Sequence, residues 1–205
     1  SDVYAVSISE DGEYIVAGSS YTSSPNTGRL YLFGKDSSTP IWTYDTSNGN
    51  AGSVGNVVIS ADGNYIVASC SNAGLFLFDR TSSTPLWNLQ DSYDSGGMIS
   101  ISADGEYVVH ATSTDNDLLR LFRKNSSTPI WTATLSDRAK DIDISYNGEY
   151  IVAGTYDEKV YLFDKDSSSP VWTHNTNEDE INVVSISADG EYIVATNNDK
   201  MYLFN

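Results

Sequence analysis

The chain has 205 residues and a formal net charge of −17, from 28 acidic and 11 basic side chains. This charge repels phosphate backbones and anionic lipid surfaces, so we expect no nucleic-acid partner. Because no apolar run approaches the roughly 20 residues of a membrane helix, we also expect no membrane insertion. The single cysteine, Cys70, excludes a disulfide within this sequence and a cysteine-based metal cluster.

Three markers recur along the chain with one period, which indicates internal repeats. Asp-Gly or Asn-Gly followed by X-Tyr occurs five times, with its glycines at Gly12, Gly63, Gly105, Gly148 and Gly190. A Leu-Phe pair also occurs five times, with its phenylalanines at Phe33, Phe78, Phe122, Phe163 and Phe204. Pro-X-Trp occurs four times and contains every tryptophan, namely Trp42, Trp87, Trp131 and Trp172. Successive glycines lie 42 to 51 residues apart, so one unit spans about 42 residues.

The first repeat begins with a strand from Val3, followed by a hairpin turn at Asp11-Gly12 in which glycine adopts a positive φ. A second strand follows, and then the longest loop of its kind, from Gly18 to Arg29. The third strand, 31–33, is apolar at successive positions, as expected for a strand covered on both faces. A polar turn then leads to the Pro-X-Trp segment, which we predict to be an outer edge strand because proline lacks an N–H.

The later repeats give the same order of strands. Third strands are predicted at 75–78, 160–163 and 202–204, and a fourth strand at 170–173. The fifth repeat has a first strand at 183–187 and a second at 192–195, both rich in β-branched residues. Helical periodicity is absent, so we predict an all-β protein. We expect one domain over residues 1–205, with repeats at about 1–52, 53–95, 96–138, 139–180 and 181–205.

Four-stranded sheets with two apolar faces bury both faces by stacking, which predicts a β-propeller of five blades. The segment VSISADGEYIVATNNDKMYLF, together with PVW, resembles the blade of WD-repeat-like propellers and the tryptophan-bearing repeat of quinoprotein-like propellers. The Gly-His pair and the Trp-Asp dipeptide of WD repeats are absent, so their histidine-based tetrad is not expected here. We predict that the core includes Ile8, Val16, Leu32, Phe33, their repeat equivalents and the four tryptophans.

The fifth repeat lacks a Pro-X-Trp segment, so we predict a three-stranded last blade. Three explanations fit this count. The ring closes with a three-stranded blade, another chain completes the fifth blade, or the sequence is a segment of a longer array. We predict that the third strand of this repeat is an outer edge, and such an edge is a template for an added strand. Its residues are Met201, Tyr202, Leu203 and Phe204.

No constellation of catalytic residues is recognisable. His110 and His174 are isolated from each other, Cys70 has no neighbouring base in the sequence, and the repeated serines occupy turns. Glycine-rich phosphate loops and Gly-X-Ser-X-Gly elbows are absent. Acidic residues gather in the variable loops, but an alternating Asp-X-Asp-X-Asp-Gly calcium loop is missing. We therefore expect no enzyme, no cofactor and no metal site.

The loops at one rim carry aromatic and acidic side chains, and loops on a rigid scaffold often bind ligands. The predicted rim residues are Tyr21, Tyr44, Tyr93, Asp115, Asp117, Tyr156 and Asp157. We expect a non-enzymatic scaffold that binds a protein partner or a second copy through this rim and the open edge. A carbohydrate-binding propeller is the alternative, and a quinone-dependent enzyme is a weaker one because no basic cluster for the cofactor is visible. The composition favours an extracellular or cell-surface location.

Overall fold

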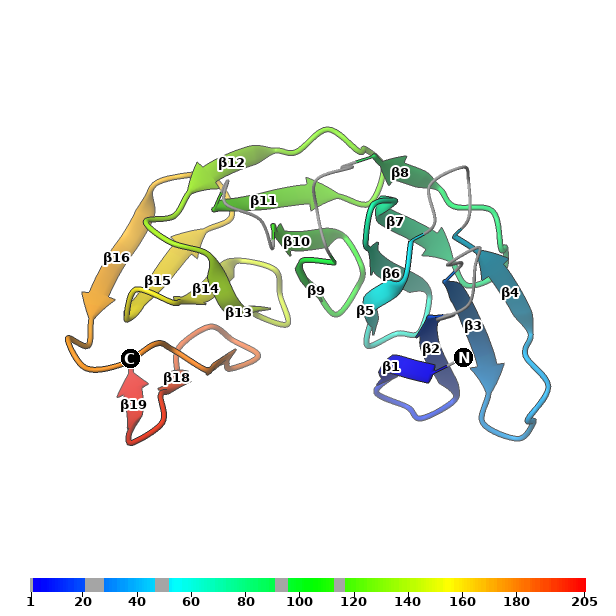
Figure 1. Cartoon of the computed structure of the whole chain (residues 1–205), viewed down its shortest axis with the longest axis horizontal. Coiled ribbons are helices and arrows are strands. Elements are labelled where there is room, and N and C mark those ends of the chain that lie inside the picture. The colour runs from blue at the N-terminus through cyan, green and yellow to red at the C-terminus, as the bar shows by residue number, and fades with distance from the viewer. Residues whose placement is uncertain (1, 21–27, 47–51, 91–95, 113–116) are drawn as a thin grey trace.

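The computed structural model describes residues 2–20, 28–46, 52–90, 96–112 and 117–205, and its regular structure there is entirely β-strand. The strands form five antiparallel sheets, four of them four-stranded and the last three-stranded. Figure 1 shows these sheets as successive blades along an arc, with the first and the fifth at its two ends. The predicted all-β class, the five blades and the three-stranded last blade are confirmed. Within the described ranges, no helix is long and apolar enough to cross a membrane.

Each blade consists of consecutive strands. Blade 1 contains β1 (Asp2–Ile8), β2 (Tyr14–Ser20), β3 (Arg29–Gly34) and β4 (Trp42–Asp45). Blade 2 contains β5 (Val54–Ile59), β6 (Tyr65–Cys70), β7 (Gly74–Asp79) and β8 (Trp87–Leu89). Blade 3 contains β9 (Met98–Ile101), β10 (Tyr107–Ala111), β11 (Leu118–Arg123) and β12 (Trp131–Thr134). Blade 4 contains β13 (Ala139–Ile144), β14 (Tyr150–Thr155), β15 (Lys159–Asp164) and β16 (Pro170–Asn175). Blade 5 contains β17 (Val183–Ile186), β18 (Ile193–Thr196) and β19 (Met201–Phe204).

The hairpin between the first two strands of each blade has one repeated design. In blade 1, the Ser9 hydroxyl donates to the Asp11 carboxylate at 2.6 Å and accepts the Tyr14 N–H at 3.1 Å. Gly12 has a φ of 71°, a backbone conformation that side chains disfavour. The equivalent glycines of the other blades have φ between 69° and 81°. The recurring Asp/Asn-Gly pair is therefore explained by turn geometry.

The third strands of blades 2 to 4 bury both of their faces because each lies between two neighbouring blades. We call the face toward the next blade along the chain the forward face, and the opposite one the backward face. In β7, Phe76 and Phe78 point backward into a cluster with Leu32 of blade 1, while Leu75 and Leu77 point forward into a cluster with blade 3. This arrangement explains the uninterrupted apolar run that the sequence shows.

The tryptophan of each fourth strand connects its blade to the next one. The Trp42 ring lies 5.6 Å from the Phe78 ring, and its indole N–H donates to the Arg80 carbonyl at 2.7 Å. Trp87 and Trp131 make the same two contacts with blades 3 and 4. The predicted packing of the tryptophans against neighbouring sheets is confirmed, and these contacts fix the spacing of successive blades.

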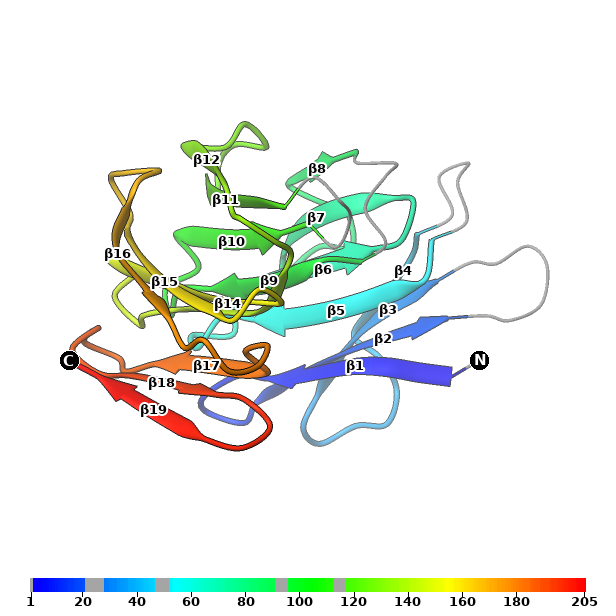
Figure 2. The same ribbon diagram turned by 60° about the vertical axis from the view of Figure 1, so that its left-hand side comes forward.

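The two end blades differ from the others. On the backward face of blade 1, Val6 and Ile8 are 67% and 58% exposed, and on the forward face of blade 5, Met201 and Leu203 are 72% and 67% exposed. The prediction that Ile8 is a core residue is therefore wrong, because no blade covers that side of β1. Phe33 is only half-buried for the same reason. The exposed faces of blades 1 and 5 do not cover each other, so the structure does not close directly from blade 5 to blade 1. In Figure 2, β19 is the outermost strand of blade 5.

Candidate functional site

The structure describes four of the seven predicted rim residues, and three blades supply them. Tyr44 belongs to blade 1, Asp117 precedes β11 of blade 3, and Tyr156 and Asp157 occupy the turn between β14 and β15 of blade 4. The other three lie outside the described residues: Tyr21, Tyr93 and Asp115. Of the four, only the adjacent pair in blade 4 shares a local site.

Tyr44 is part of the interface between blades rather than an exposed rim residue. Its ring lies 5.0 Å from Phe78 in an edge-to-face arrangement and 5.7 Å from Phe76. Such aromatic contacts stabilise the packing of blade 1 on blade 2. The interpretation of Tyr44 as a solvent-facing rim residue is corrected accordingly, because alternation along β4 turns its side chain toward β7.

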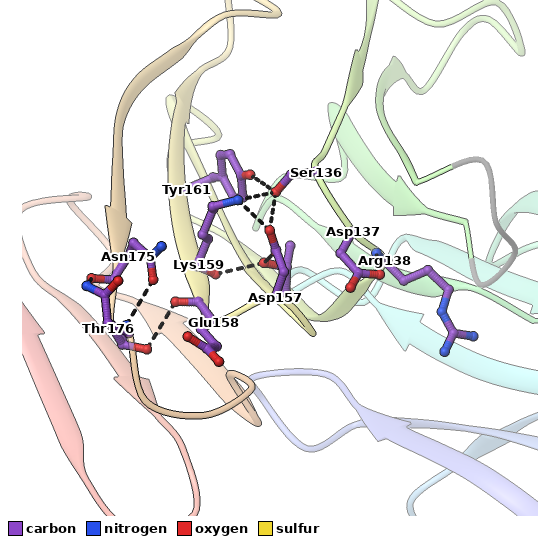
Figure 3. A network of polar contacts seen from close by, with 11 residues as sticks. Ser136, Asp137, Arg138, Asp157, Glu158, Lys159, Tyr161, Asn175 and Thr176 are labelled. Atoms are coloured by element: carbon purple, nitrogen blue, oxygen red, sulfur yellow. Dashed lines mark hydrogen bonds and ion pairs between the residues drawn. The ribbon is translucent and has the colours of Figure 1, made fainter.

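Asp157 lies in a closed network that joins blades 3 and 4 (Figure 3). Its carboxylate accepts hydrogen bonds from the Ser136 hydroxyl, the Lys159 ammonium group and, at 2.6 Å, the Thr155 hydroxyl. Ser136 also lies 2.6 Å from the Tyr161 hydroxyl and accepts from Lys159 at 2.7 Å. Ser136 follows the last strand of blade 3, so the network fastens that strand to the hairpin of blade 4.

The electrostatics of Asp157 agree with a structural role. Burial alone raises the pKa of this carboxyl, but the hydrogen bonds from Lys159, Ser136 and Thr155 outweigh it and hold the pKa below its usual value. Both carboxylate oxygens are engaged by side chains of the chain itself. A ligand that bound the Asp157 carboxylate would therefore have to displace hydrogen bonds made within the chain.

The Tyr156 side chain is partly exposed to solvent, and the cationic groups of two side chains lie near its ring. The Arg138 guanidinium lies 4.9 Å from the centre of its ring, and the Lys140 ammonium group lies 5.2 Å from it. These residues line a depression of about 310 Å³ together with Met98 and Asn182. Lys140 also pairs with Glu180, which offsets part of the positive charge at this predicted rim position.

A set of polar residues on the innermost strands was not found from the sequence. On β13, the Asp141 carboxylate accepts the Val184 N–H of blade 5 at 2.9 Å, and Asp143 accepts the Ile186 N–H at 3.1 Å. Inner strands are sheet edges, so their free backbone groups need partners from the next blade. Burial raises the pKa of Asp141, and the neighbouring Asp143 adds to that effect. The signal in the sequence is Asp at position 143, where the other first strands carry Ser or Val, and at position 141, where they carry Ala, Asn, Met or Val.

The isolated candidates of the sequence occupy ordinary structural positions. Cys70 is buried in the core between blades 1 and 2. His110 is buried in β10. His174 belongs to β16, and its ring lies 5.1 Å from the Phe204 ring of blade 5. Across the residues that the structure describes, no group of three or more His, Cys, Asp or Glu side chains could hold a metal ion.

The predicted edge strand is the feature that separates blade 5 from the others. β3, β7, β11 and β15 each pair with two strands, whereas β19 pairs with β18 alone in the described sheets. In blades 1 to 3 the carbonyl of the leucine in the Leu-Phe pair accepts the N–H of the residue just before the fourth strand, for example that of Ile41 on Leu32 at 2.7 Å. By repeat equivalence, the Leu203 backbone faces the open side. β19 therefore offers an exposed edge beside an exposed apolar face.

The sequence model of a protein family described as outer membrane protein assembly factor BamB matches residues 78–205, which is more than half of the chain. This match supports the quinoprotein-like resemblance and does not specifically support the WD-repeat-like one. A search of curated proteins found no match to the chain.

Proposed function

Because the chain belongs to the family of the outer membrane protein assembly factor BamB, a family of quinoprotein-like β-propeller repeats, we propose that it is a non-enzymatic binding or assembly module. It takes up an extended segment of a protein partner as a fourth strand on β19. The observation that carries this proposal is the open edge of β19, whose four counterparts are all covered by a fourth strand. Strand addition supplies affinity through backbone hydrogen bonds and specificity through alternate side chains.

The exposed side chains at this edge fit such an interaction. Met201 and Leu203 point to the forward side, where a partner strand and its neighbouring residues would cover them. Tyr202 and Phe204 point backward and support the strand against blade 4, with Phe204 5.1 Å from Trp172. The edge is therefore held rigidly by blade 4 while its backbone remains accessible, which limits the entropic cost of binding. An extracellular or cell-surface location is part of this proposal.

The proposal is tested by supplying the fourth strand within the chain. A copy of residues 165–175 is fused after Asn205, and a fusion with the same residues in scrambled order is the control. We expect the native-order extension to raise the melting temperature by at least about 4 °C, since 1 kcal/mol corresponds to about 2–4 °C at this size. It should also suppress any association through this edge.

The opposite result is equally clear. If both fusions melt with the parent chain, and all three remain monomeric over a wide concentration range, β19 does not accept a strand. The proposed function would then be wrong.

A further inference from the structure

The turn between β11 and β12 of blade 3 contains a sequence pattern that the proposed function does not use. Asn125-Ser126-Ser127 is the single Asn-X-Ser or Asn-X-Thr segment of this sequence, and this pattern is the acceptor for N-linked glycosylation. The equivalent turns of the other four-stranded blades also continue with Ser-Ser, but they begin with Asp36, Thr81 and Asp166. Blade 3 therefore differs from them at the residue that a glycan requires.

The structure holds the backbone of this turn in place and leaves the Asn125 side chain exposed. The preceding residue, Lys124, donates its N–H to the Glu106 carbonyl at 3.0 Å, and its carbonyl accepts the Trp87 indole N–H at 2.9 Å. Within the residues that the structure describes, neither the Asn125 amide group nor the Ser127 hydroxyl makes a hydrogen bond. An enzyme that attaches N-linked glycans recognises these two groups, so both are available to it.

The equivalent side chains of blades 2 and 4 are engaged by their own turns. The Thr81 hydroxyl donates to the Asp79 carboxylate at 2.6 Å, and the Asp166 carboxylate lies 3.1 Å from the Lys165 ammonium group. Asn125 has no such contact in the described part of the chain. A group attached to its amide nitrogen would displace no hydrogen bond there.

A depression of about 350 Å³ between blades 2 and 3 lies directly beside Asn125, which is one of its lining residues. The others are Tyr65, Asp79, Leu86, Trp87 and Lys124. Leu86 is 52% exposed, and the two aromatic side chains are half-buried. The C–H groups of a sugar ring pack against aromatic and aliphatic side chains, and its hydroxyls form hydrogen bonds with carboxylate and ammonium groups. The depression offers both kinds of contact.

We propose that Asn125 is an acceptor site for an N-linked glycan, and that the first sugar of this glycan packs in the depression beside it. The donor is a sugar linked to a polyprenyl phosphate or diphosphate. The Asn125 amide nitrogen forms a bond to the anomeric carbon of that sugar, and the bond between this carbon and the phosphate oxygen breaks. The phosphate leaves with the electron pair and takes up the proton that the nitrogen loses.

This inference rests on the extracellular or cell-surface location in the proposed function, because a chain meets such a donor during or after export. It does not compete with strand addition. The turn between β11 and β12 lies midway along the arc of blades, whereas β19 lies at one end (Figure 1). A glycan on blade 3 therefore leaves the open edge of blade 5 accessible.

The experiment is mass spectrometry of the full chain after export from cells that attach N-linked glycans. Asn125→Gln and Ser127→Ala each remove the acceptor pattern, and Ser127→Thr retains it. We expect the parent chain and Ser127→Thr to carry one glycan, located on Asn125 by peptide analysis, and the other two variants to carry none. An exported parent chain without a glycan, or a glycan that persists in Asn125→Gln, would overturn the assignment.

The contact with the depression is tested by moving the acceptor. Thr81→Asn combined with Asn125→Gln places the pattern on the equivalent turn of blade 2, where the Arg80 guanidinium lies 4.3 Å from the centre of the Tyr14 ring and covers it. We expect the glycan on Asn125 to raise the melting temperature by about 2–4 °C relative to the enzymatically deglycosylated chain, and the moved glycan to leave it unchanged. Equal shifts at both positions would show that the sugar does not pack in the depression.

The strand-fusion experiment separates this inference from strand addition, because it needs no glycan. If Asn125 is unmodified and the native-order fusion is still stabilised, only the glycosylation site is wrong. If Asn125 carries the glycan and the fusion gains nothing, the glycosylation site stands and strand addition on β19 is wrong.

Discussion

Blades 2 and 5 contain almost the same third strand and place it in opposite environments. Leu77 of β7 is 0% exposed, whereas its equivalent Leu203 of β19 is 67% exposed. Phe78 and Phe204 both lie against the tryptophan of the preceding blade, so the backward faces remain alike. The forward faces differ because blade 3 covers β7 and nothing in the described chain covers β19. Burial here depends on the neighbour of a strand and not on its own sequence.

The largest expected effect comes from truncating the same leucine in both blades. Leu77→Ala should lower the free energy of unfolding by about 2–5 kcal/mol, since it leaves a cavity in a closed interface. Leu203→Ala should change it by less than about 0.5 kcal/mol, because that side chain is exposed. Urea unfolding of both variants measures the difference. Equal losses would show that the forward face of blade 5 is covered in solution.

Added volume should distinguish a blade interface from an outer surface. A methyl group on Gly154 would lie 2.4 Å from a methyl carbon of Ile181, so Gly154→Ala should cost about 1–3 kcal/mol through overpacking. At Gly34 the nearest atom is 3.8 Å away, in ordinary contact, and Gly34→Ala should be neutral within about 0.5 kcal/mol. Thermal unfolding compares the two. A neutral Gly154→Ala would mean that blades 4 and 5 are packed more loosely than described.

The tryptophan contact offers a smaller test of the same comparison. Trp42→Phe removes the hydrogen bond to the Arg80 carbonyl, whereas Trp172→Phe removes an indole for which no acceptor is found in the described residues. We expect Trp42→Phe to be more destabilising by about 0.5–1.5 kcal/mol, the net value of one hydrogen bond. Chemical unfolding of both variants gives this difference, and its absence would argue against the connecting role of the indole N–H.

The smallest effects concern pH, and two aspartates should respond with opposite sign. Asp157 has a lowered pKa, so it stabilises the fold above its unfolded pKa of about 3.9 and loses this contribution as the pH falls through its folded pKa. Asp141 has a raised pKa, so its charge opposes folding at neutral pH and stability recovers as the pH falls through that value. Asp157→Asn should therefore destabilise at pH 7, and Asp141→Asn should not. Melting curves from pH 3 to 7 test both signs, and parallel profiles would contradict them.

The sequence was sufficient to predict the architecture because every blade repeats its own turn and core signals. Gly12 and its equivalents identify the hairpins, and the Leu-Phe pairs identify strands covered on both faces. It could not predict that Ile8 is exposed while Ile59 is buried, because both have the same local pattern and differ only in their neighbours. The prediction for Tyr44 failed for a related reason. Side chains alternate between the two faces of a strand, so a shift of one residue in the predicted strand decides whether Tyr44 faces the rim or the neighbouring blade.

The site was less predictable than the fold. Five third strands against four Pro-X-Trp segments predict one uncovered edge strand, and in the structure this strand is β19. The bonds of Asp141 and Asp143 to the next inner strand depend on how adjacent blades are offset, which no local pattern encodes. The pocket lined by Tyr150 and Leu162 of blade 4 and Glu191 of blade 5 likewise combines residues of two blades, so no single repeat predicts it.

Amide hydrogen exchange of β7 and β19 tests the central claim most directly, with and without a peptide of residues 165–175. The account predicts slow exchange throughout β7, fast exchange at the outward-facing amides of β19 in the chain alone, and strong protection of those amides when the peptide is saturating. Protection of β19 equal to that of β7 before any addition, or no gain of protection with the peptide, would contradict an open edge that accepts a strand.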